Sequence, residues 1–376
     1  MVDLKELRDE IDSIDRQIVE LFEKRMDICQ KVAEYKIRTG KKVFDRTREQ
    51  AKIDTVKGLT RSEFNRHGIE ELFQQIMAMS RKLQYQLLEE NGVAGRLPFI
   101  AVDEIERSKV RVVFQGVEGA YSQAAMKQYF NEDITSFHVE QWRDAMEAIA
   151  EGSADFAVLP IENSTAGSVN DMYDLLVEFE NYIVGEQIIK CEHALLGLPG
   201  TKLEDIQKVY SHQQALSQCE EFLAQHRSWQ TIPYDNTATS VKKVAEDGDR
   251  TQAAIGSKFA AELFGLEVLA DHVYYNEANS TRFIIVTNQR IFRRDAQKIS
   301  ICFEVPHYSG ALYNILSHFI YNNLNMNKIE SRPAAGRNWE YRFFVDFDGN
   351  LNDSAVKNAL RGIREEAINM KILGNY

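Results

Sequence analysis

One apolar repeat governs the first 40 residues of this 376-residue chain. Its apolar side chains recur at alternating steps of three and four residues from Leu4 to Tyr35, and the one exception is Arg25. This spacing predicts a long α-helix with a coiled-coil-like apolar stripe. The stripe consists of Leu4, Leu7, Ile11, Ile14, Ile18, Leu21, Ile28, Val32 and Tyr35.

Arg25 interrupts this stripe with a charge. Burying a guanidinium without a partner is costly, so we expect an anion to meet it. Lys36 lies on the same helix face, about 16 Å further along the axis. Together the two side chains can hold a small anionic ligand. The alternative is an ion pair between Arg25 and a protein carboxylate such as Glu49.

Two further helices are predicted in this block, and both carry polar groups on a packed face. The third helix has an apolar repeat over residues 69–87 that is interrupted by Ser80, with Gln84 one turn later. Such interruptions predict a polar pocket inside a helical bundle. The alternative for Ser80 is a hydrogen bond to a backbone carbonyl. The second helix places three charged residues on one face, namely Asp45, Arg48 and Glu49.

Arg8 lies 17 residues before Arg25, which is about 25 Å along one helix. It can therefore serve such a pocket only in a second copy of the chain, and this favours an intertwined dimer. Residues 24–52 hold ten Lys or Arg against four Asp or Glu, although the whole chain has a net charge of −12. This local excess suggests a small anion, while the acidic chain is a poor candidate for binding nucleic acid or an anionic membrane. A charged helix surface exposed to solvent is the alternative.

Composition narrows the class of protein further. No apolar run approaches the roughly 20 residues that span a bilayer, and the first residues show no apolar leader, so we expect a cytoplasmic protein. Four scattered cysteines predict buried thiols, neither a disulfide framework nor a zinc site.

Residues 91–98 contain two glycines and a proline, which predicts a linker. From Val110 onward, short apolar runs alternate with helical stretches, which predicts an α/β sheet flanked by helices. Several runs end in small polar residues, including Ser122, Asn163 and Ser211. We expect these at helix N-termini, where α/β proteins bind anions. Simple helix capping is the alternative.

The last segment, residues 298–376, reads as strand, helix, strand, strand, helix and strand. This order predicts a ferredoxin-like α+β domain.

The N-terminal block resembles the all-helical chorismate mutase family over residues 1–90, through LRDEID, EKR, AEYK, DRTRE and Ser80-x-x-x-Gln84. The resemblance implies conversion of chorismate to prephenate by a [3,3] rearrangement, which requires no nucleophile, metal or cofactor. It implies that Arg8 of a second copy and Arg25 grip carboxylates, with Arg48 nearby. Lys36 and Gln84 would bind the ether oxygen, and Glu49 the ring hydroxyl. The implied pocket is Arg8, Arg25, Lys36, Asp45, Arg48, Glu49, Ser80 and Gln84.

Residues 109–288, after a linker over 91–108, resemble prephenate dehydratase. The matching strings are FQGVEGAYS, PIENSTAG, YSH followed by Gln218, and NSTRF. The resemblance implies two α/β lobes like a periplasmic binding protein and conversion of prephenate to phenylpyruvate, CO2 and water. Thr281 would face the leaving hydroxyl, and Arg282 would clamp a carboxylate unless it forms a structural ion pair. The cleft would be lined by Glu162, Asn163, Ser164, Thr165, Ser211 and Gln218.

GALY at 310–313 and ESRP at 330–333 resemble the ACT regulatory domain of phenylalanine-sensitive dehydratases. The resemblance implies that L-phenylalanine binds at a subunit interface and inhibits. A helix start at Gly310 suits an amino-acid carboxylate. From spacing alone, Gly310 only opens a helix and 331–333 form a turn. The implied effector residues are Gly310, Ala311, Leu312, Glu330, Ser331 and Arg332.

The sequence thus predicts a multidomain, bifunctional enzyme of phenylalanine biosynthesis that acts as a dimer or tetramer. A non-catalytic sensor built from a helical dimerisation module is the alternative. A dehydratase with an inactive helical dimeriser is a third reading, but the intact set of Arg25, Lys36 and Gln84 speaks against it.

Overall fold

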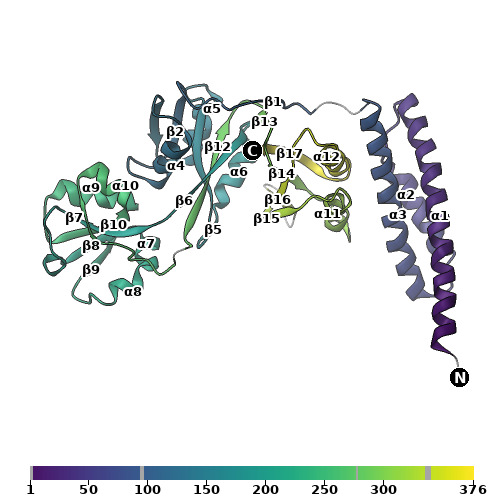
Figure 1. The fold of residues 1–376 in the computed structure, drawn as a ribbon, viewed down its shortest axis with the longest axis horizontal. Helices are drawn as coiled ribbons and strands as arrows, with labels where there is room; N and C mark the ends of the chain where they lie inside the picture. Colours follow the sequence, from purple (N-terminus) through teal and green to yellow (C-terminus); the bar gives the residue numbers. More distant parts are fainter. Residues whose placement is uncertain (1–2, 94–96, 277, 335–339) are drawn as a thin grey trace. The chain divides into compact units, whose positions relative to one another are not determined.

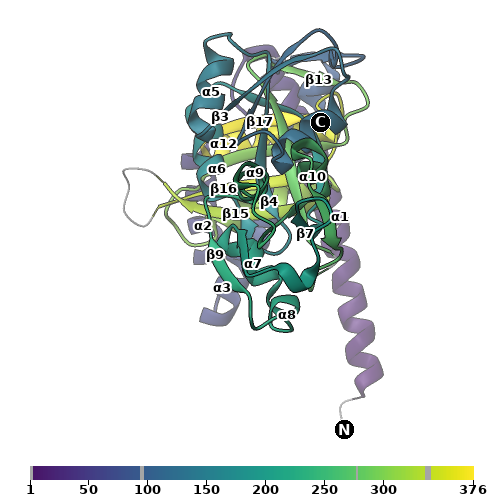
Figure 2. The same ribbon diagram turned by 90° about the vertical axis from the view of Figure 1, so that its left-hand side faces the viewer.

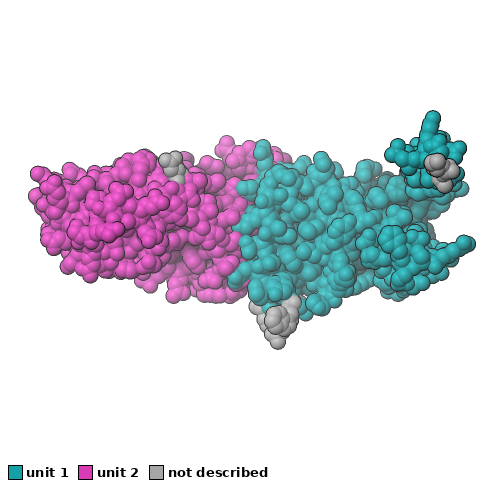
Figure 3. Space-filling view, turned by 90° about the horizontal axis from the view of Figure 1, so that it is seen from below, with its two compact units in different colours: residues 1–98, 297–372 teal, residues 99–296, 373–376 magenta. Residues whose placement is uncertain are grey.

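A computed structural model describes residues 3–93, 97–276, 278–334 and 340–376. The chain divides into two compact units, coloured separately in Figure 3. The first unit joins the N-terminal block to most of the C-terminal segment, and the second contains the middle of the chain. Their bounds are Met1–Pro98 with Gln297–Ile372, and Phe99–Ala296 with Leu373–Tyr376. No helix within the described ranges is long and apolar enough to cross a membrane.

The N-terminal block consists of three helices, as predicted. Helix α1 starts where the Asp3 side chain accepts a hydrogen bond from the Lys5 backbone and stops at Gly40. Its first turns, which carry Arg8, extend beyond the start of helix α3 (Figures 1 and 2). Asp45 caps the second helix by accepting a hydrogen bond from the Arg48 backbone at 3.1 Å, so it lies before this helix and not on its face. The helices are α1 (Leu4–Thr39), α2 (Arg46–Gly58) and α3 (Glu63–Glu90).

The apolar stripe of α1 is uncovered within the described chain. Ile11, Ile14 and Ile18 are 56%, 55% and 54% exposed, respectively. Apolar side chains spaced in this way along one helix are a surface for another helix.

The C-terminal segment has the predicted order of strands and helices. Its strands align in the order β15-β16-β14-β17, and both helices lie on one side of them (Figure 1). Buried Phe303, Phe319 and Phe347 form part of its core. The elements are β14 (Lys298–Glu304), α11 (Ala311–Tyr321), β15 (Met326–Pro333), β16 (Tyr341–Asp348), α12 (Ser354–Glu366) and β17 (Ile368–Asn375).

The second unit contains two larger sheets with flanking helices and the small pair of β1 (Ile100–Val102) and β13 (Ile291–Arg293), and this confirms the α/β prediction (Figure 1). One has the strand order β6-β12-β4-β2-β3, with β5 paired to β4. Its strands are β2 (Arg111–Gln115), β3 (Thr135–Val139), β4 (Phe156–Asn163), β5 (Gly167–Ser168), β6 (Tyr182–Lys190) and β12 (Ser280–Thr287). The other has the order β11-β7-β10-β8-β9. Its strands are β7 (His193–Gly197), β8 (Lys208–Ser211), β9 (Gln230–Pro233), β10 (Gln252–Ser257) and β11 (Glu267–Ala270).

The chain passes between these two sheets twice, after β6 and before β12. Residues near both crossings therefore lie at the boundary between the lobes. The helices of this unit are α4 (Tyr121–Tyr129), α5 (Trp142–Ala150), α6 (Asn170–Glu178), α7 (Gln213–Gln218), α8 (Glu220–Leu223), α9 (Thr237–Asp247) and α10 (Lys258–Phe264), with a short 3-10 helix at Leu203–Asp205.

Three local expectations differ from the structure. The linker expected over 91–108, of which 94–96 lie outside the described residues, contains strand β1 (Ile100–Val102), which pairs with β13 (Ile291–Arg293). One of the helical stretches predicted after Val110, over residues 213–224, is broken at Cys219. Residues 162–165 do not open a helix, because Asn163 Oδ1 accepts hydrogen bonds from the next backbone amides and forms a turn into β5.

Candidate active sites

Arg25 reaches the polar interruption of α3. Its guanidinium donates hydrogen bonds to Ser80 Oγ and, at 3.7 Å, to Cys29 Sγ. Ser80 in turn donates to the Ile76 carbonyl at 2.7 Å. Among the described residues, no carboxylate forms an ion pair with Arg25, so the alternative pairing with Glu49 is wrong. The cation in the apolar stripe is held by neutral groups and retains its charge for a ligand.

Gln84 adds a second buried polar group to this cluster. Its amide nitrogen donates to the Ser80 carbonyl at 3.2 Å. Its amide oxygen is buried and has no hydrogen-bond partner in the described structure. Buried polar atoms are rarely left unpaired, so this position fits a polar ligand.

Lys36 lies on the wall of a cavity of about 680 Å³ together with Asp45 and Arg48. The cavity lining includes six Lys or Arg side chains but a single carboxylate, that of Asp45. Lys36 Nζ donates to the Val43 carbonyl at 2.7 Å, and burial lowers the pKa of Lys36 although Glu49 opposes this effect. The excess of positive charge suits an anionic ligand.

A second site lies where β12 and β4 meet, in the other unit. The antiparallel register sets Thr281 opposite Asn163. Asn163 Nδ2 donates to Thr281 Oγ1 at 3.0 Å, and Cys191 Sγ lies 3.2 Å from the same oxygen. Burial raises the pKa of the Cys191 thiol, so it stays protonated and can donate. Thr281 Oγ1 thus accepts from Asn163, whereas either the hydroxyl or the thiol can donate in its contact with Cys191.

A series of hydrogen bonds between side chains holds Asn163 in place. Asn163 Nδ2 also donates to Asn279 Oδ1 at 2.9 Å, and Asn279 Nδ2 donates to Gln218 Oε1 at 3.1 Å. The same Gln218 oxygen lies 2.9 Å from His193 Nε2, which must therefore be the donor. Burial lowers the pKa of His193. The neutral ring then accepts at Nδ1 from the Tyr121 hydroxyl, 3.1 Å away.

The comparisons with known proteins match the two parts of the chain that hold these sites to two enzyme families. Residues 7–85 match the family model of chorismate mutase type II, and residues 112–291 match that of prephenate dehydratase. A bifunctional chorismate mutase/prephenate dehydratase from Enterobacter agglomerans is 32% identical over 377 residues, which cover 98% of this chain and 95% of that protein. The chain belongs to the bifunctional chorismate mutase/prephenate dehydratase family. The predicted pair of enzyme domains is confirmed, and the sensor alternative is not favoured.

Two solved structures resemble a large part of the chain. A prephenate dehydratase from Arthrobacter aurescens, solved in complex with L-Phe, has a TM-score of 0.66 and 32% identity. The match covers 71% of this chain and 89% of that chain. GqqA, described as a novel type of quorum-quenching acylase, has a TM-score of 0.65 and 31% identity, with 71% and 96% of the two chains covered.

The remaining predicted residues of the dehydratase domain hold its backbone and charges in place. Ser164 Oγ donates to the Ala278 carbonyl and accepts from the Ser280 backbone, both at 2.9 Å. Thr165 Oγ1 donates to Asn279 Oδ1 at 3.4 Å. Ser211 is fully buried and donates to the Ile255 carbonyl at 2.7 Å, which ties β8 to β10.

Arg282 lies among carboxylates of the dehydratase domain itself. Its Nε is 3.6 Å from Glu162 Oε2, and its Nη1 is 3.6 Å from Glu186 Oε2. These contacts favour the structural ion pair over the substrate clamp for Arg282.

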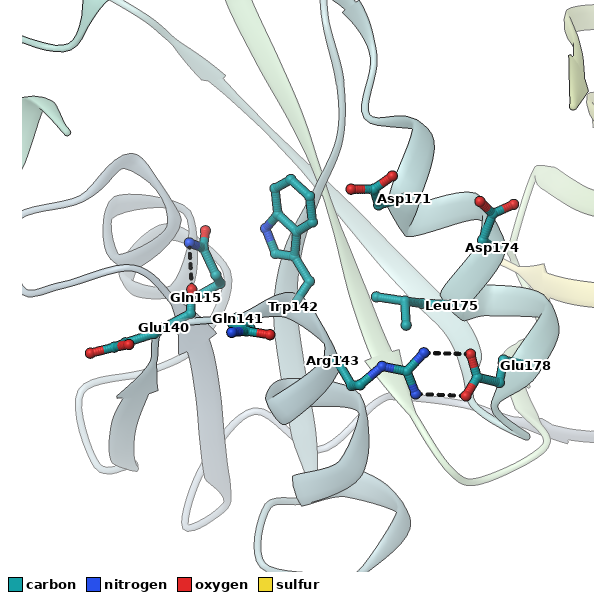
Figure 4. A pocket seen from close by; sticks show the side chains of 9 residues that line it. All are labelled: Gln115, Glu140, Gln141, Trp142, Arg143, Asp171, Asp174, Leu175 and Glu178. Atoms are coloured by element: carbon teal, nitrogen blue, oxygen red, sulfur yellow. Dashed lines mark hydrogen bonds and ion pairs between the residues drawn. The ribbon is translucent and has the colours of Figure 1, made fainter. Parts of the chain in front are cut away.

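A second cavity, of about 500 Å³, lies in the dehydratase domain and is shown in Figure 4. Four carboxylates and one arginine, Arg143, line it, and Arg143 forms two hydrogen bonds of 2.6 Å to Glu178. This negative charge makes it unsuitable for a dianionic substrate.

The expected effector residues lie on two elements of the C-terminal segment. Gly310 precedes α11 with φ at 81°, a left-handed conformation that favours glycine. Ala311 is buried in the first turn. Glu330, Ser331 and Arg332 lie on β15, the outer strand that begins the order β15-β16-β14-β17.

The sequence reasoning missed four residues that the structure places at the two sites. Cys191 and His193 follow β6 and carry no recognisable motif, and Tyr121 was noted only as part of a string. Arg81 was not singled out in the sequence. It is buried and donates to Glu49, which therefore has a cation beside it.

Proposed function

We propose that the mutase pocket binds chorismate between α1, α2 and α3, with Arg25 on a carboxylate and Lys36 and Gln84 on the ether oxygen. The observation that carries this proposal is Arg25, a cation within an apolar stripe whose protein partners are neutral. The rearrangement breaks and forms bonds in one step, so the protein supplies orientation and stabilises negative charge on the ether oxygen. Lys36 and the Gln84 amide are suitable donors.

A second copy of the chain completes this pocket. The stripe of α1 is exposed at Ile11, Ile14 and Ile18, and pairing with another α1 would bury it. Arg8 lies too far along α1 to reach Arg25 of its own chain. In a dimer, Arg8 of one copy would meet the second carboxylate in the pocket of the other.

Prephenate loses its ring hydroxyl and one carboxylate at the dehydratase site. Electrons of the breaking bond to the carboxylate enter the ring as CO2 leaves, and the departing hydroxide takes a proton to become water. Because Asn163 donates to the Thr281 oxygen, the Thr281 hydroxyl can turn its own proton toward the leaving hydroxyl of the substrate. A hydroxyl is a weak acid, so Thr281 polarises or relays rather than acting as an isolated acid.

The C-terminal segment acts as an ACT domain that binds L-phenylalanine and inhibits the enzyme. Its strand order, the left-handed Gly310 before α11 and the resemblance of GALY and ESRP support this assignment. The candidate ligands lie on α11 and on the outer strand β15, so a second copy would close the site.

Purified protein supplied with chorismate tests the whole proposal. Wild type should form prephenate and then phenylpyruvate, and L-phenylalanine should slow the overall conversion. Lys36→Ala should block the first step, whereas Thr281→Ala should accumulate prephenate. Formation of neither product by folded wild-type protein would refute the proposal.

A further inference from the structure

A buried arginine links the mutase pocket to the C-terminal segment. Arg81 of α3 is 7% exposed and directs its two terminal amino groups to different carboxylates. One donates to Glu49 Oε2, and the other donates to Glu366 Oε1 of α12 at 2.8 Å. Glu366 also lies 3.0 Å from His318 Nε2 of α11.

The link is part of a continuous packing of α12 along α3. Lys357 and Arg361 lie 3.2 and 3.7 Å from the Glu89 carboxylate, one near the start and one in the middle of α12. At the end of α12, the Tyr85 hydroxyl donates to Glu365. The two helices therefore run antiparallel, and the end of α12 lies beside the mutase pocket.

Gly362 allows this arrangement on the side of α12 that faces α11. A Cβ at Gly362 would lie 2.3 Å from the His318 ring, closer than any side chain tolerates. Glycine within a helix costs about 1 kcal/mol relative to alanine. The close approach explains its presence, because it lets His318 reach Glu366 one turn further along.

The division of the guanidinium between two carboxylates leaves one oxygen of Glu49 available. Arg81 contacts Glu49 Oε2, and no hydrogen-bond partner of Glu49 Oε1 occurs in the described structure. An arginine released from Glu366 would be able to bind both oxygens of Glu49, since bidentate pairing is the favoured geometry of arginine with carboxylates.

We propose that Glu366 of the C-terminal segment is a positioning residue for the mutase reaction. By holding one amino group of Arg81, it prevents Arg81 from clamping both oxygens of Glu49. One oxygen of Glu49 then accepts the hydrogen bond from the ring hydroxyl of the substrate. This inference rests on the role of Glu49 in the proposed mutase function, and it makes the regulatory segment part of the mutase site.

The charges around Glu49 determine its pKa, so substitutions of these groups should shift the pH profile of the mutase reaction. Burial raises the pKa of Glu49, Arg81 lowers it, Glu366 raises it and Lys36 lowers it. Glu366 is itself kept ionised: against the effect of burial, His318 and Arg81 lower the pKa of Glu366. Removing Arg81 should therefore move the acid limb of the mutase pH profile to higher pH, and removing the charge of Glu366 should move it to lower pH.

The test uses the full-length chain with chorismate as substrate and compares Glu366→Gln, Arg81→Met and Glu49→Gln. Glu366→Gln should lower mutase kcat/KM by about tenfold, the loss expected for one charge-assisted hydrogen bond. Arg81→Met should lower it at acid pH, because Glu49 loses the cation that lowers its pKa, and the acid limb should therefore shift in the opposite direction. Glu89→Gln is the matched control, because it breaks the ion pairs of Lys357 and Arg361 away from the pocket and should retain wild-type kinetics.

Each contrary outcome has a definite meaning. Wild-type kinetics of Glu366→Gln, an equal loss in Glu89→Gln, or acid limbs that move in the same direction would overturn the inference. Thermal unfolding of each variant, followed by circular dichroism, reports whether the chain is folded. If Glu366→Gln does not fold, Glu366→Asp, which keeps the charge but shortens the reach to Arg81, must lower kcat/KM or the inference fails. Full mutase activity of Glu49→Gln would instead refute the proposed role of Glu49 in the mutase reaction, on which this inference rests.

Discussion

Asn163 on β4 lies directly across from Thr281 on β12, and its amide donates a hydrogen bond of 3.0 Å to the threonine hydroxyl. Asn163 is itself held through Asn279 and Gln218, which belong to segments near the crossings between the two lobes. The hydroxyl is thereby fixed before substrate arrives. Fixed geometry of this kind is what orients a weak acid for catalysis.

Thr281→Ala should lower dehydratase kcat/KM by at least about 100-fold, because it removes the hydroxyl that we propose to act on the leaving group. Thr281→Ser is the matched control and should retain most of the rate. Conversion of prephenate to phenylpyruvate, followed by absorbance, gives both values. Mutase activity should persist in Thr281→Ala, and loss of both activities in a folded variant would argue against separate sites.

His193 should make the dehydratase domain less stable in acid. Because burial lowers the pKa of His193, the unfolded chain binds this proton more readily than the folded chain does. The stability associated with neutral His193 is present above the ordinary pKa of about 6.5 and is lost as pH falls below it. The urea midpoint should fall more between pH 7.5 and 5.5 in wild type than in His193→Gln. Equal decreases would contradict this account.

The mutase rate should not collapse between pH 6 and 8. Gln84 carries no proton that titrates, so it donates to the ether oxygen without prior protonation. At high pH the rate should fall as Lys36 loses its charge, and burial places that loss below the ordinary value of 10.5. Lys36→Arg should move this alkaline limb upward, since arginine stays charged. A pH series of initial rates from chorismate checks both limbs.

Hybrid dimers should reveal the contribution of Arg8. Arg8→Ala and Arg25→Ala should each lose mutase activity as homodimers. A mixed dimer of the two variants contains one pocket with Arg25 from one chain and Arg8 from the other, and it should recover about half of the wild-type rate per dimer if each pocket acts independently. Mixing that restores nothing, although the mixed dimer forms, would place Arg8 outside the pocket.

The sequence predicted the mutase site better than its surroundings. Arg25 and Ser80 stood out because each interrupts an apolar helical repeat, Gln84 follows Ser80 by one turn, and the structure brings the three together. Arg81 did not stand out in the sequence, because its partner Glu366 is 285 residues away and no repeat links the two residues. Polar pairs that form only after distant segments pack leave no periodic signal.

At the dehydratase site, too, the sequence indicated residues that belong to a local pattern and missed those that only the folded chain brings together. The apolar runs predicted its strands, and NSTRF pointed to Thr281. The chain from Tyr121 through His193 to Gln218 joins three segments that come together only in the folded domain. Residues 162–165 were misread as a helix start, since the turn that Asn163 forms uses the same small polar residues that cap helices.

A crystal structure with a dicarboxylate mimic of the rearranging chorismate tests the central claim most directly. The account predicts one carboxylate on Arg25, the other on Arg8 of a second copy, and the ether-like oxygen beside Lys36 and Gln84. A structure in which the mimic binds elsewhere while Arg25 is neutralised by protein carboxylates would contradict it.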